Sequence, residues 1–593
     1  MINLTINNIS VNVPEGTSIL KAAEKLNIKI PRLCYHEDLC IEGNCRVCVV
    51  EVKGAKTLVA SCATPVSEGM EVITNSINVR TARKHIIELL LSEHNSECTK
   101  CYKNGKCELQ ALGNEYAVGE KVFIDLTAEN DYIIDRSSPS IIKDDSKCIK
   151  CQRCVRTCEE LQYISAIGVA HKGAEMKIST FYDLPMGSVI CTNCGQCVNR
   201  CPTGALIENL SLDNVWNAIL DPSKHVVVQT APAVRIALGE ELGFNPGERI
   251  TGKLVTSLKM LGFDSVLDTD FTADLTIMEE GTELLTRLKK LLVEKEKGIH
   301  LPMFTSCSPG WIKFIEHKYP DLLNGLSTCK SPQQMFGALA KTYYAQKRSI
   351  NPENIISVSI MPCTAKKFEA DRPEMYSSGY KDVDYVLTTR ELAHMIKEAG
   401  IDFMKLEDSQ YDNIMGKSSG AAAIFGATGG VMEAALRTAY EIITGNEVPF
   451  ENLNIEPVRG TEGVREASVK INNCLPEWKF LEGKELKCAV AHGLVNARNL
   501  INQVKKGEKT FHFIEIMACP GGCLGGGGQP VPTNAEIRRK RTKAIYDEDM
   551  NMEIRKSHEN AEIIQLYKDF LGEPNSHKAH ELLHTHYIKR SSY

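Results

Sequence analysis

The 593-residue sequence lacks the segments that direct a chain to a membrane or to nucleic acid. It has no run of about 18 uninterrupted apolar residues, the length that a transmembrane helix needs. Its start, MINLTINNISVNVPEG, shows no charged stretch followed by an apolar one, so we expect no signal peptide. Its 69 basic and 75 acidic residues form no concentrated basic block, which argues against a nucleic-acid partner. We therefore expect a cytoplasmic protein.

Nucleotide-binding loops are also missing. No GxGxxG sequence follows an expected strand and no GxxxxGK[ST] sequence occurs, so neither a dinucleotide site nor a nucleoside-triphosphate site is evident. The composition, 43% hydrophobic and 24% charged, is that of an ordinary globular protein and excludes a disordered or collagen-like chain. The length suggests about four domains of roughly 150 residues each.

Cysteine, in contrast, is abundant. Of the 23 cysteines, 16 lie between residues 34 and 201. Because thiols stay reduced in the cytosol, this density indicates metal ligation rather than disulfide bonding. Two later cysteines without a motif, Cys474 and Cys488, are expected to be small buried hydrophobic residues.

The first domain, residues 1–78, is predicted to be β-rich, with strands near 4–6 and 9–13 and a helix over 17–26. Four of its cysteines have the spacing C-x10-C-x2-C-x13-C, which suits a 2Fe–2S cluster; they are Cys34, Cys45, Cys48 and Cys62. Cys40 offers an alternative first ligand, because with Cys45 and Cys48 it has the plant-type ferredoxin spacing.

Residues 79–118 combine one histidine with three cysteines in the order H-x3-C-x2-C-x5-C: His94, Cys98, Cys101 and Cys107. One imidazole and three thiolates could hold either zinc or a 4Fe–4S cluster, and the spacing does not decide between them.

Residues 139–209 contain an internal repeat of the form C-x2-C-x2-C-x3-C. This is the signature of two-cluster ferredoxins, in which the fourth cysteine of each run binds the other cluster. The predicted ligand sets are Cys148, Cys151, Cys154 with Cys201, and Cys191, Cys194, Cys197 with Cys158.

The remainder, residues 210–593, alternates expected strands (225–229 and 355–361) with expected helices (279–294 and 432–444), which is typical of a layered α/β domain. Three of its segments place cysteine beside proline or glycine: TSCSPGW at 305–311, MPCTAKKFE at 361–369 and EIMACPGGCLGGG at 515–527. Four soft ligands drawn from such distant segments could hold one further cluster.

These segments resemble the three signatures of the iron-only (FeFe) hydrogenases, TSCCPxW, MPCxxKxxE and ExMxCxxGCxxGGG. The second and third match at every fixed position and the first differs at one. The resemblance covers essentially the whole chain, including the order of the upstream cluster motifs. It implies an α/β and α+β multidomain fold. The expected parts are a β-grasp 2Fe–2S domain (1–78), a His/Cys cluster domain (79–118), a two-cluster ferredoxin domain (139–209) and a two-lobed α/β catalytic domain with a C-terminal wrap (210–593).

The resemblance also implies the cofactors. They are one 2Fe–2S cluster with Cys34 as its first ligand, three accessory 4Fe–4S clusters, one of them bound by His94, and the H-cluster. The H-cluster is a 4Fe–4S cubane bridged to a di-iron centre that carries CO, CN⁻ and an azadithiolate. The implied cubane ligands are Cys363, Cys519 and Cys523, with Cys523 as the bridge.

The residues around the di-iron centre follow from the same resemblance. Lys366 and the backbone around Ala231-Pro232 are implied to hydrogen-bond cyanide. The implied pocket residues are Met361, Met517 and Phe425, with Ser331 and Gln333 beside them.

Ser308 departs from the family pattern, because it stands where TSCCPxW has a cubane ligand. Three alternatives stay open: Ser308 itself binds iron, Cys307 shifts from its implied role as proton relay to that of ligand, or Cys329 takes the place. Of these we favour Cys307.

The resemblance further implies a proton relay through Cys307, Glu280, Ser327, Glu283 and Arg287. Glu280, Glu283 and Arg287 have spacings of three and four residues, so a helix would carry them along one face.

The predicted function is reversible oxidation of H2 to protons and electrons, with electrons relayed through the clusters to ferredoxin or to a flavin- and NAD(P)-binding partner subunit. The alternatives are an H2-sensing or electron-relay protein with little turnover, and an iron–sulfur assembly factor. The histidine-rich SHKAHELLHTHY near the end is expected to be a surface helix terminus.

Overall fold

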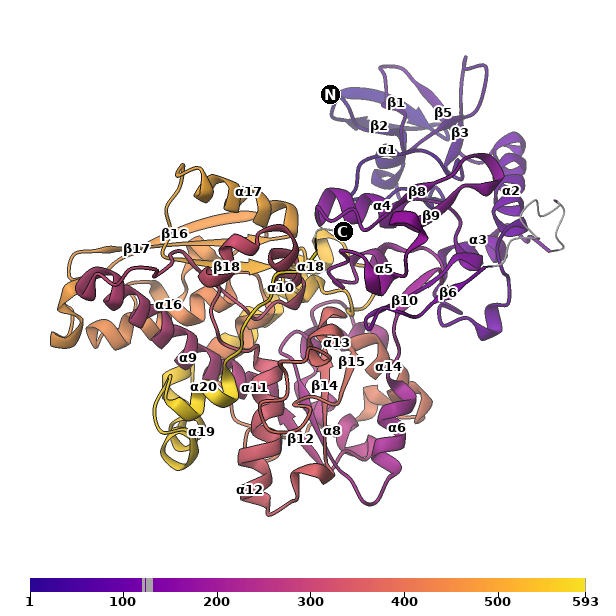
Figure 1. The fold of residues 1–593 in the computed structure, drawn as a ribbon. Helices are drawn as coiled ribbons and strands as arrows, with labels where there is room; N and C mark the ends of the chain where they lie inside the picture. Colours follow the sequence, from indigo (N-terminus) through magenta and orange to yellow (C-terminus); the bar gives the residue numbers. More distant parts are fainter. Residues whose placement is uncertain (120–122, 124–131, 592–593) are drawn as a thin grey trace. The chain divides into compact units, whose positions relative to one another are not determined.

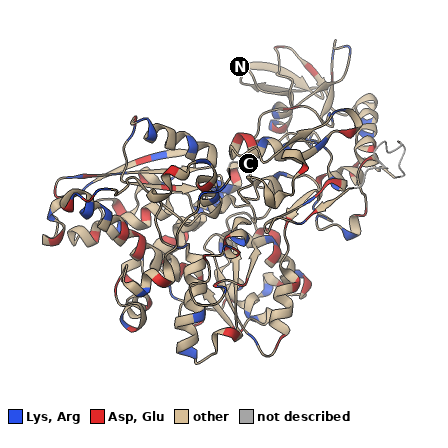
Figure 2. Cartoon of the chain, in the orientation of Figure 1, with Lys and Arg blue, Asp and Glu red and all other residues tan. Residues whose placement is uncertain are grey.

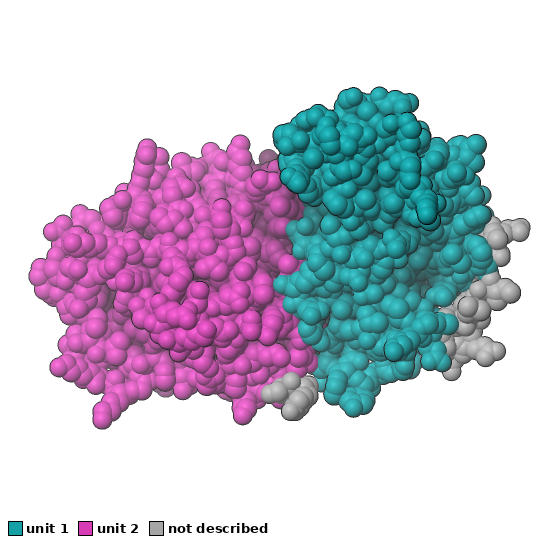
Figure 3. Space-filling view, turned by 90° about the horizontal axis from the view of Figure 1, so that it is seen from above, with its two compact units in different colours: residues 1–160, 165–189, 200–207 teal, residues 161–164, 190–199, 208–593 magenta. Residues whose placement is uncertain are grey.

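The computed structural model describes residues 1–119, 123 and 132–591 and divides into two compact units (Figures 1 and 3). Unit 1 comprises residues 1–160, 165–189 and 200–207. Unit 2 comprises residues 161–164, 190–199 and 208–593. None of the helices in these described ranges combines the length and the apolar character that crossing a bilayer requires.

Unit 1 begins with a five-stranded sheet of order β2-β1-β5-β3-β4. Its strands are β1 (Ile2–Ile6), β2 (Ile9–Val13), β3 (Val49–Val52), β4 (Val59–Ala60) and β5 (Glu71–Ile73). Asn7 and Asn8, both with positive φ, make the tight turn between β1 and β2. Helix α1 (Ile19–Lys25) begins at Ser18, whose hydroxyl accepts a hydrogen bond from the Lys21 N–H.

The rest of unit 1 is built from short elements that leave long cysteine-bearing loops between them. They are α2 (Ile77–Ser92), α3 (Glu108–Glu115), α4 (Arg153–Arg156), a sheet of order β10-β7-β6 (Leu206–Glu208, Ile141–Asp144, Ile134–Asp135) and the hairpin β8-β9 (Ile167–Ala170, Lys177–Thr180).

Unit 2 contains two sheets. The first is a parallel sheet of order β12-β11-β14-β15, and its strands are Ser265–Asp268, His225–Thr230, Ile355–Met361 and Tyr385–Thr388. The predicted strands at 225–229 and 355–361 are confirmed as β11 and β14. Around this sheet lie α6 (Leu212–Leu220), α8 (Thr251–Leu261), α11 (Pro332–Leu339) and α14 (Thr389–Glu398).

The second sheet of unit 2 has the order β13-β18-β17-β16, with strands Met303–Phe304, Phe513–Met517, Glu485–His492 and Val464–Lys470. Only β16 runs antiparallel to its neighbour among these strands. The helices that accompany it are α10 (Pro309–Lys318), α16 (Gly430–Thr444) and α17 (Leu494–Lys505).

The long helix α9 (Thr269–Lys289) differs from the helix predicted at 279–294. It begins directly after β12, where the Asp268 carboxylate accepts a hydrogen bond from the Asp270 N–H. Most of α9 is buried on all sides, so its first half lacks the apolar and polar periodicity that marks a surface helix. That is why the sequence pattern detected only its C-terminal half.

The chain ends in α18 (Ala535–Asn551), α19 (Ala561–Leu566) and α20 (His577–Leu583). His577 and His580 are exposed, as predicted for the histidine-rich segment, but His584 is only 8% exposed, which corrects that prediction. Cys474 and Cys488 are buried, as predicted. Figure 2 shows the positions of basic and acidic residues interspersed along the helices of both units.

Candidate active site and cluster sites

The three cysteine motifs of unit 2 share one structural position: each follows the carboxyl end of a parallel strand. Cys363 lies two residues after β14, Cys519 two residues after β18, and Cys307 three residues after β13. Ala231-Pro232 likewise follows β11. Ligand sites form outside the carboxyl ends of parallel strands, where the loops of neighbouring strands converge. Segments far apart in the sequence thus line one cavity.

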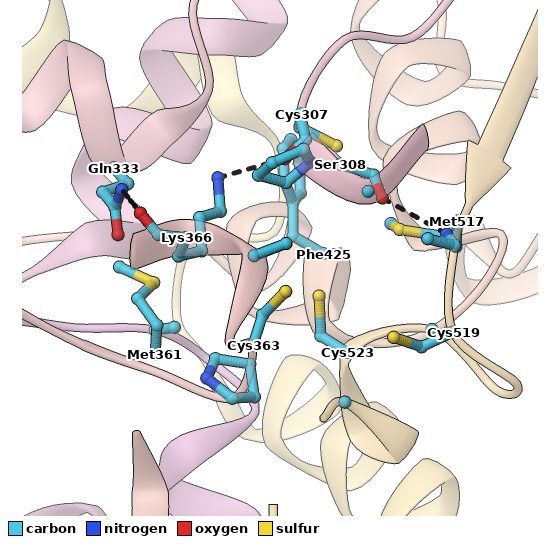
Figure 4. A pocket seen from close by; sticks show the side chains of 18 of the residues that line it. Cys307, Ser308, Gln333, Met361, Cys363, Lys366, Phe425, Met517, Cys519 and Cys523 are labelled. Atoms are coloured by element: carbon cyan, nitrogen blue, oxygen red, sulfur yellow. Dashed lines mark hydrogen bonds between the residues drawn. The ribbon is translucent and has the colours of Figure 1, made fainter. Parts of the chain in front are cut away.

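This cavity contains about 800 Å³ of space free of protein atoms, including the part that opens to solvent. The thiols of Cys363, Cys519 and Cys523 point toward a common space in it (Figure 4). Burial raises the pKa of the Cys523 thiol to about 12, and the neighbouring Cys363 adds to the shift. Thiolates at such a place need a bound cation to offset their charge, so the donor set fits an iron–sulfur cluster.

Lys366 lies on α13 (Ala365–Ala370), the helix that begins just after Cys363. Its ammonium is buried and donates hydrogen bonds to the Cys307 carbonyl oxygen at 3.1 Å and to Glu369 Oε2 at 2.9 Å. The same Glu369 oxygen accepts from Ser331 Oγ at 2.8 Å and Gln333 Nε2 at 3.1 Å. One buried carboxylate therefore holds Lys366 and Gln333, which line the cavity, together with the neighbouring Ser331.

Another part of the cavity lining is apolar. It is formed by Met361, Met517 and Phe425, all of which line the cavity as predicted (Figure 4). Ala231 and Pro232 line it too. The Ala231 N–H, however, donates to the Ile360 carbonyl oxygen at 3.1 Å, and proline has no N–H. These two residues therefore offer the cavity an apolar surface, and neither of their own backbone nitrogens is available as the donor that the resemblance implied for the backbone around them.

The three candidates for the fourth cubane ligand occupy different places. Ser308 and Cys307 both line the cavity, but in Figure 4 the Cys307 thiol is not directed at the three converging thiols. The Ser308 hydroxyl accepts a hydrogen bond from the Ala518 N–H at 3.2 Å, beside Cys519. Cys329 does not line the cavity; its Sγ lies 3.9 Å from Glu283 Oε2.

The predicted proton-relay residues form a buried polar series. Glu280 and Glu283 are 2% and 9% exposed, so the helix face that carries them is not a solvated one. Ser327 Oγ donates to Glu283 Oε2 at 2.9 Å, and Arg287 Nη2 donates to Glu283 Oε1 at 2.6 Å. Burial and the nearby Glu283 carboxylate raise the pKa of Glu280 to about 8. Burial raises the pKa of the Cys307 thiol well above its usual range, and the charge of Glu280 adds to the shift.

The glycine-rich loop after β18 approaches other backbone segments too closely for a side chain. A Cβ at Gly526 would lie 2.1 Å from the Pro362 carbonyl oxygen, beside Cys363. Gly522 has a φ of +77°, and a Cβ there would meet the Thr428 nitrogen at 2.7 Å. The loop also receives a hydrogen bond that the sequence did not indicate: the Gly521 N–H donates to His492 Nδ1 at 3.2 Å.

Comparison with known proteins agrees with this arrangement. Residues 224–527 match the family described as iron only hydrogenase large subunit, C-terminal domain, and residues 535–590 match the iron hydrogenase small subunit. The chain is 50% identical to the NADP-reducing hydrogenase subunit HndD of Solidesulfovibrio fructosivorans over 100% of this chain and 99% of that one. The chain belongs to the iron-only hydrogenases.

A second relative and a solved structure extend the likeness. Iron hydrogenase 1 of Clostridium pasteurianum is 43% identical over 99% of this chain and 100% of its own. An apo [FeFe]-hydrogenase HydA1 variant from Chlamydomonas reinhardtii superposes with a TM-score of 0.58 at 45% identity, covering 65% of this chain and 100% of that one. The predicted family, the predicted hydrogenase activity and the mixed α/β multidomain fold are confirmed.

The hydrogenase carries further cluster-type segments before residue 208. Residues 1–76 match a 2Fe–2S iron–sulfur cluster binding domain. Residues 83–121 match the NADH-ubiquinone oxidoreductase-G iron–sulfur binding region, and residues 138–207 match the ferredoxin-like domain of NADH-quinone oxidoreductase subunit 3. The presence of iron–sulfur domains ahead of the catalytic domain is confirmed.

Within unit 1 of the hydrogenase, four thiols meet at the first site. The Cys34 N–H donates to Cys45 Sγ at 3.4 Å, and the sulfurs of Cys48 and Cys62 are 3.4 Å apart. The Cys34 thiol also interacts with that of Cys62. Cys40 is exposed, and its thiol donates to Glu160 Oε1 at 2.6 Å. The geometry thus brings together the set that begins with Cys34 rather than the one that begins with Cys40.

The next two predicted sites also lie in unit 1. His94, Cys98, Cys101 and Cys107 all stand on the segment between α2 and α3, and His94 is 7% exposed. Further along, a cavity of about 440 Å³ is lined by the four cysteines of one predicted ferredoxin set: Cys148, Cys151, Cys154 and Cys201. The fourth cysteine of the second run therefore lies with the first three of the first run, the crossed arrangement that the spacing predicts.

Cys191, Cys194 and Cys197 belong to unit 2, and Cys158, the fourth member predicted for this set, belongs to unit 1. Cys194 also lines the active-site cavity. Asn193 next to it accepts hydrogen bonds from Lys313 Nζ at its side-chain oxygen and from Thr364 Oγ1 at its carbonyl oxygen, both at 2.7 Å. These bonds tie the Cys191–Cys197 loop to α10 and to the loop that carries Cys363.

Three residues with evident positioning roles were not predicted. Glu369 holds Lys366, Ser331 and Gln333, and it is the last residue of the MPCxxKxxE signature, which could have indicated it. Glu515, the first residue of ExMxC, accepts hydrogen bonds from the N–H groups of Gly429 and Met432 at the start of α16. His492 belongs to no motif, so no local signal could have identified it.

Proposed function

We propose that this chain catalyses the reversible reaction H2 ⇌ 2 H⁺ + 2 e⁻ with an H-cluster bound in the cavity of unit 2. The observation that carries the proposal is the convergence of the Cys363, Cys519 and Cys523 thiols in a cavity that also presents a buried ammonium, Lys366, and two thioethers. Cys523 is the proposed bridge between the cubane and the di-iron part. When bound, the di-iron part supplies the metal chemistry of H–H bond cleavage and formation.

The protein's share of this chemistry is to exclude water, orient the cluster and supply charge. Met361, Met517 and Phe425 keep one side of the cavity apolar, so charges inside it are weakly screened. Lys366, fixed by Glu369, is positioned to donate to an anionic cyanide, and Ser331 and Gln333 extend the same hydrogen-bonded wall.

We infer that Ser308 is the fourth ligand of the cubane and that Cys307 handles protons. Ser308 lies at the cavity wall beside Cys519, whereas the Cys307 thiol neighbours Glu280. This changes the preference drawn from sequence alone, which favoured Cys307 as the ligand. A serine oxygen is a harder donor than a thiolate, so this cubane should differ in potential from an all-cysteine one.

Protons are proposed to move between the cavity and solvent through Cys307, Glu280, Ser327, Glu283 and Arg287. Each of these groups can give and take a proton or orient a neighbour that does. Glu280, with a pKa of about 8, stays protonated at neutral pH and can pass a proton in either direction. Arg287, whose side chain is 13% exposed, holds Glu283 by an ion pair at the proposed outer end.

Electrons are proposed to travel through one 2Fe–2S and three accessory 4Fe–4S clusters held by the ligand sets predicted from sequence, in domains at 1–78, 79–118 and 139–209, the first of β-grasp type. Residues 210–593 would form the two-lobed catalytic domain. Cys194 supports the final step, because it belongs to a predicted cluster and lines the active-site cavity. Cysteine thiols stay reduced in the cytoplasm, so these ligand sets are consistent with the proposed cytoplasmic location.

The electron partner is proposed to be a separate subunit that binds flavin and NAD(P), with ferredoxin as the alternative. HndD, a subunit of an NADP-reducing hydrogenase, matches the chain over its whole length. No nucleotide-binding loop is evident in the sequence, so the nucleotide would have to bind elsewhere. The purified single chain should therefore evolve and oxidise H2 with viologen dyes but fail to reduce NAD(P)⁺.

The test of the proposed function is infrared spectroscopy of the matured chain combined with H2 turnover. We expect CO and CN⁻ stretching bands and rapid turnover with reduced viologen. Bands with negligible turnover would favour the H2-sensing or electron-relay alternative, and the absence of bands in fully matured protein would contradict the proposal.

A further inference from the structure

Cys329 and His584 are neighbours outside the active-site cavity, although neither belongs to a hydrogenase signature. They oppose each other in an isolated antiparallel bridge between the loop before α11 and the residue after α20, two helices that lie side by side (Figure 1). The Thr585 N–H donates to the Thr328 carbonyl oxygen at 2.7 Å, and the Lys330 N–H donates to the Leu583 carbonyl oxygen at 2.8 Å. Opposed residues of such a bridge project to the same side, so the thiol and the imidazole meet.

A third potential metal ligand, Glu283, comes from α9. One ligand atom each from Glu283, Cys329 and His584 lies within 4.8 Å of the others. The three residues are 9%, 0% and 8% exposed. They come from three distant parts of the chain, and small side-chain rotations would let a single ion contact all of them.

The histidine is held in an orientation that leaves one ring nitrogen for a metal. Its Nε2 lies 3.1 Å from Glu279 Oε2, and because a carboxylate can only accept, Nε2 carries the proton. Its Nδ1, 2.8 Å from Thr328 Oγ1, is then an acceptor. Histidines that bind zinc usually donate one N–H to a carboxylate and bind the metal through the other nitrogen. At His584 a metal ion would replace the Thr328 hydroxyl on Nδ1.

The charge around the three ligands also favours a cation. Glu279, Glu280 and Glu283 all lie buried on α9, and among the described residues Arg287 forms an ion pair with Glu283 while His584 lies against Glu279. Burial and these carboxylates raise the pKa of the Cys329 thiol well above its usual range. A divalent cation would offset the charge of a thiolate and a carboxylate at once.

We propose that Glu283, Cys329 and His584 form a binding site for Zn²⁺, and that zinc bound there stops proton transfer through Glu283. Nitrogen, sulfur and carboxylate oxygen together suit zinc, whereas Mg²⁺ and Ca²⁺ prefer oxygen ligands alone. Binding releases the Cys329 thiol proton to solvent and forms a Zn–S bond. The Glu283 oxygen that binds the ion can no longer accept a proton from Ser327. The effect of zinc on proton transfer through Glu283 rests on the proposed function.

The binding test uses the matured full-length chain, treated with a chelator that leaves its iron intact and then titrated with Zn²⁺. The zinc X-ray absorption edge reports its ligands without interference from iron. We expect one sulfur at about 2.3 Å with nitrogen and oxygen at about 2.0–2.2 Å. C329A, and C329S should C329A fold poorly, should lose the sulfur contribution and bind zinc at least about tenfold more weakly, since loss of even an outer-shell partner costs 10–100-fold.

The matched control is a second histidine and carboxylate cluster near the surface, Glu441, His558 and Glu559. H558A should leave the sulfur-containing site unchanged. Zinc that binds wild type and C329A equally well, or that is lost in H558A but not in C329A, overturns the proposal. Electron paramagnetic resonance spectra of the clusters, recorded before and after zinc, must stay the same, because zinc that displaces cluster iron would also overturn it.

The activity test separates this proposal from the proposed function. Measured against each protein's own rate without zinc, zinc should slow viologen-driven H2 evolution in wild type and H558A but not in C329A. If zinc binds with the expected sulfur contribution and the rate is unaffected, proton passage through Glu283 is overturned while the metal site stands. If zinc does not bind, the site is overturned whatever the activity.

Discussion

Lys366 Nζ donates a hydrogen bond to the carbonyl oxygen of Cys307 at 3.1 Å, so a side chain of the second signature fixes the backbone of the first. The same ammonium reaches Glu369 on its own helix. Lysine at this position therefore joins two loops of the cavity wall in addition to its proposed role as a cyanide donor.

K366A should leave the Glu369 carboxylate buried without its ammonium partner. Hydrogen bonds to charged groups contribute about 1.5–3 kcal/mol each, so we expect the free energy of unfolding to fall by about 2–3 kcal/mol. We also expect the variant to lose the infrared bands of the di-iron part after maturation. K405A, at a lysine whose side chain is 84% exposed, is the control and should change neither. Normal bands in a folded K366A protein would contradict the proposed role.

Alanine substitutions at Cys307 and Ser308 should have separable effects. C307A should keep the cubane and its electron paramagnetic resonance signal but lose about 10²–10⁴-fold in turnover, the usual contribution of a proton-transfer group. S308A should alter the cubane signal and its potential, and S308C should raise that potential, because thiolate is a softer donor than an alkoxide. If C307A loses the cubane while S308A keeps it unchanged, Cys307 is the ligand, as sequence alone favoured.

The sequence could predict those features that recur at fixed spacing. The crossed ferredoxin pairing and the strands β11 and β14 follow from local patterns, and the family signatures imply the cubane cysteines. The structure brings together Cys148, Cys151, Cys154 and Cys201 in one cavity and Cys363, Cys519 and Cys523 in another. Residue roles that depend on contacts between distant parts of the chain could not be predicted from the sequence. His492 contacts the ligand loop only because β17 lies beside β18, and Cys329 meets His584 only through an isolated bridge. Nor could spacing reveal that the Ala231 N–H bonds Ile360.

Turnover should depend on pH through Glu280. Its pKa of about 8 lies above that of an unfolded glutamate, about 4.3, so the folded protein retains this proton at neutral pH. We expect the rate of H2 evolution to fall as pH rises through about 8, and E280Q to lose about 10²–10⁴-fold at all pH values. E294Q, at an exposed residue just beyond α9, is the control. An unshifted pH profile in an active E280Q enzyme would remove Glu280 from the relay.

The same raised pKa makes a prediction about stability. Between about pH 4.3 and 8 the unfolded chain releases the Glu280 proton and the folded chain keeps it, so the stability of the wild type should decrease as pH rises through this window. E280Q cannot ionise and should lack this contribution. Thermal unfolding of both proteins between pH 5 and 9 measures the difference, and parallel curves would contradict the raised pKa.

His492 should stabilise the cubane loop only while its imidazole is neutral. Burial lowers its pKa to about 4, and its Nδ1 accepts the Gly521 N–H beside the proposed ligands. An unfolded histidine titrates near 6.5, so this contribution should be complete above pH 6.5 and should be lost as pH falls toward 4. In thermal unfolding, H492Q should lose less stability than wild type over that range. It should also bind the cubane more weakly and therefore retain less iron. H577Q, at a histidine whose side chain is 90% exposed, should behave as wild type. If H492Q and wild type lost stability and iron in parallel, the imidazole would have no part in holding the loop.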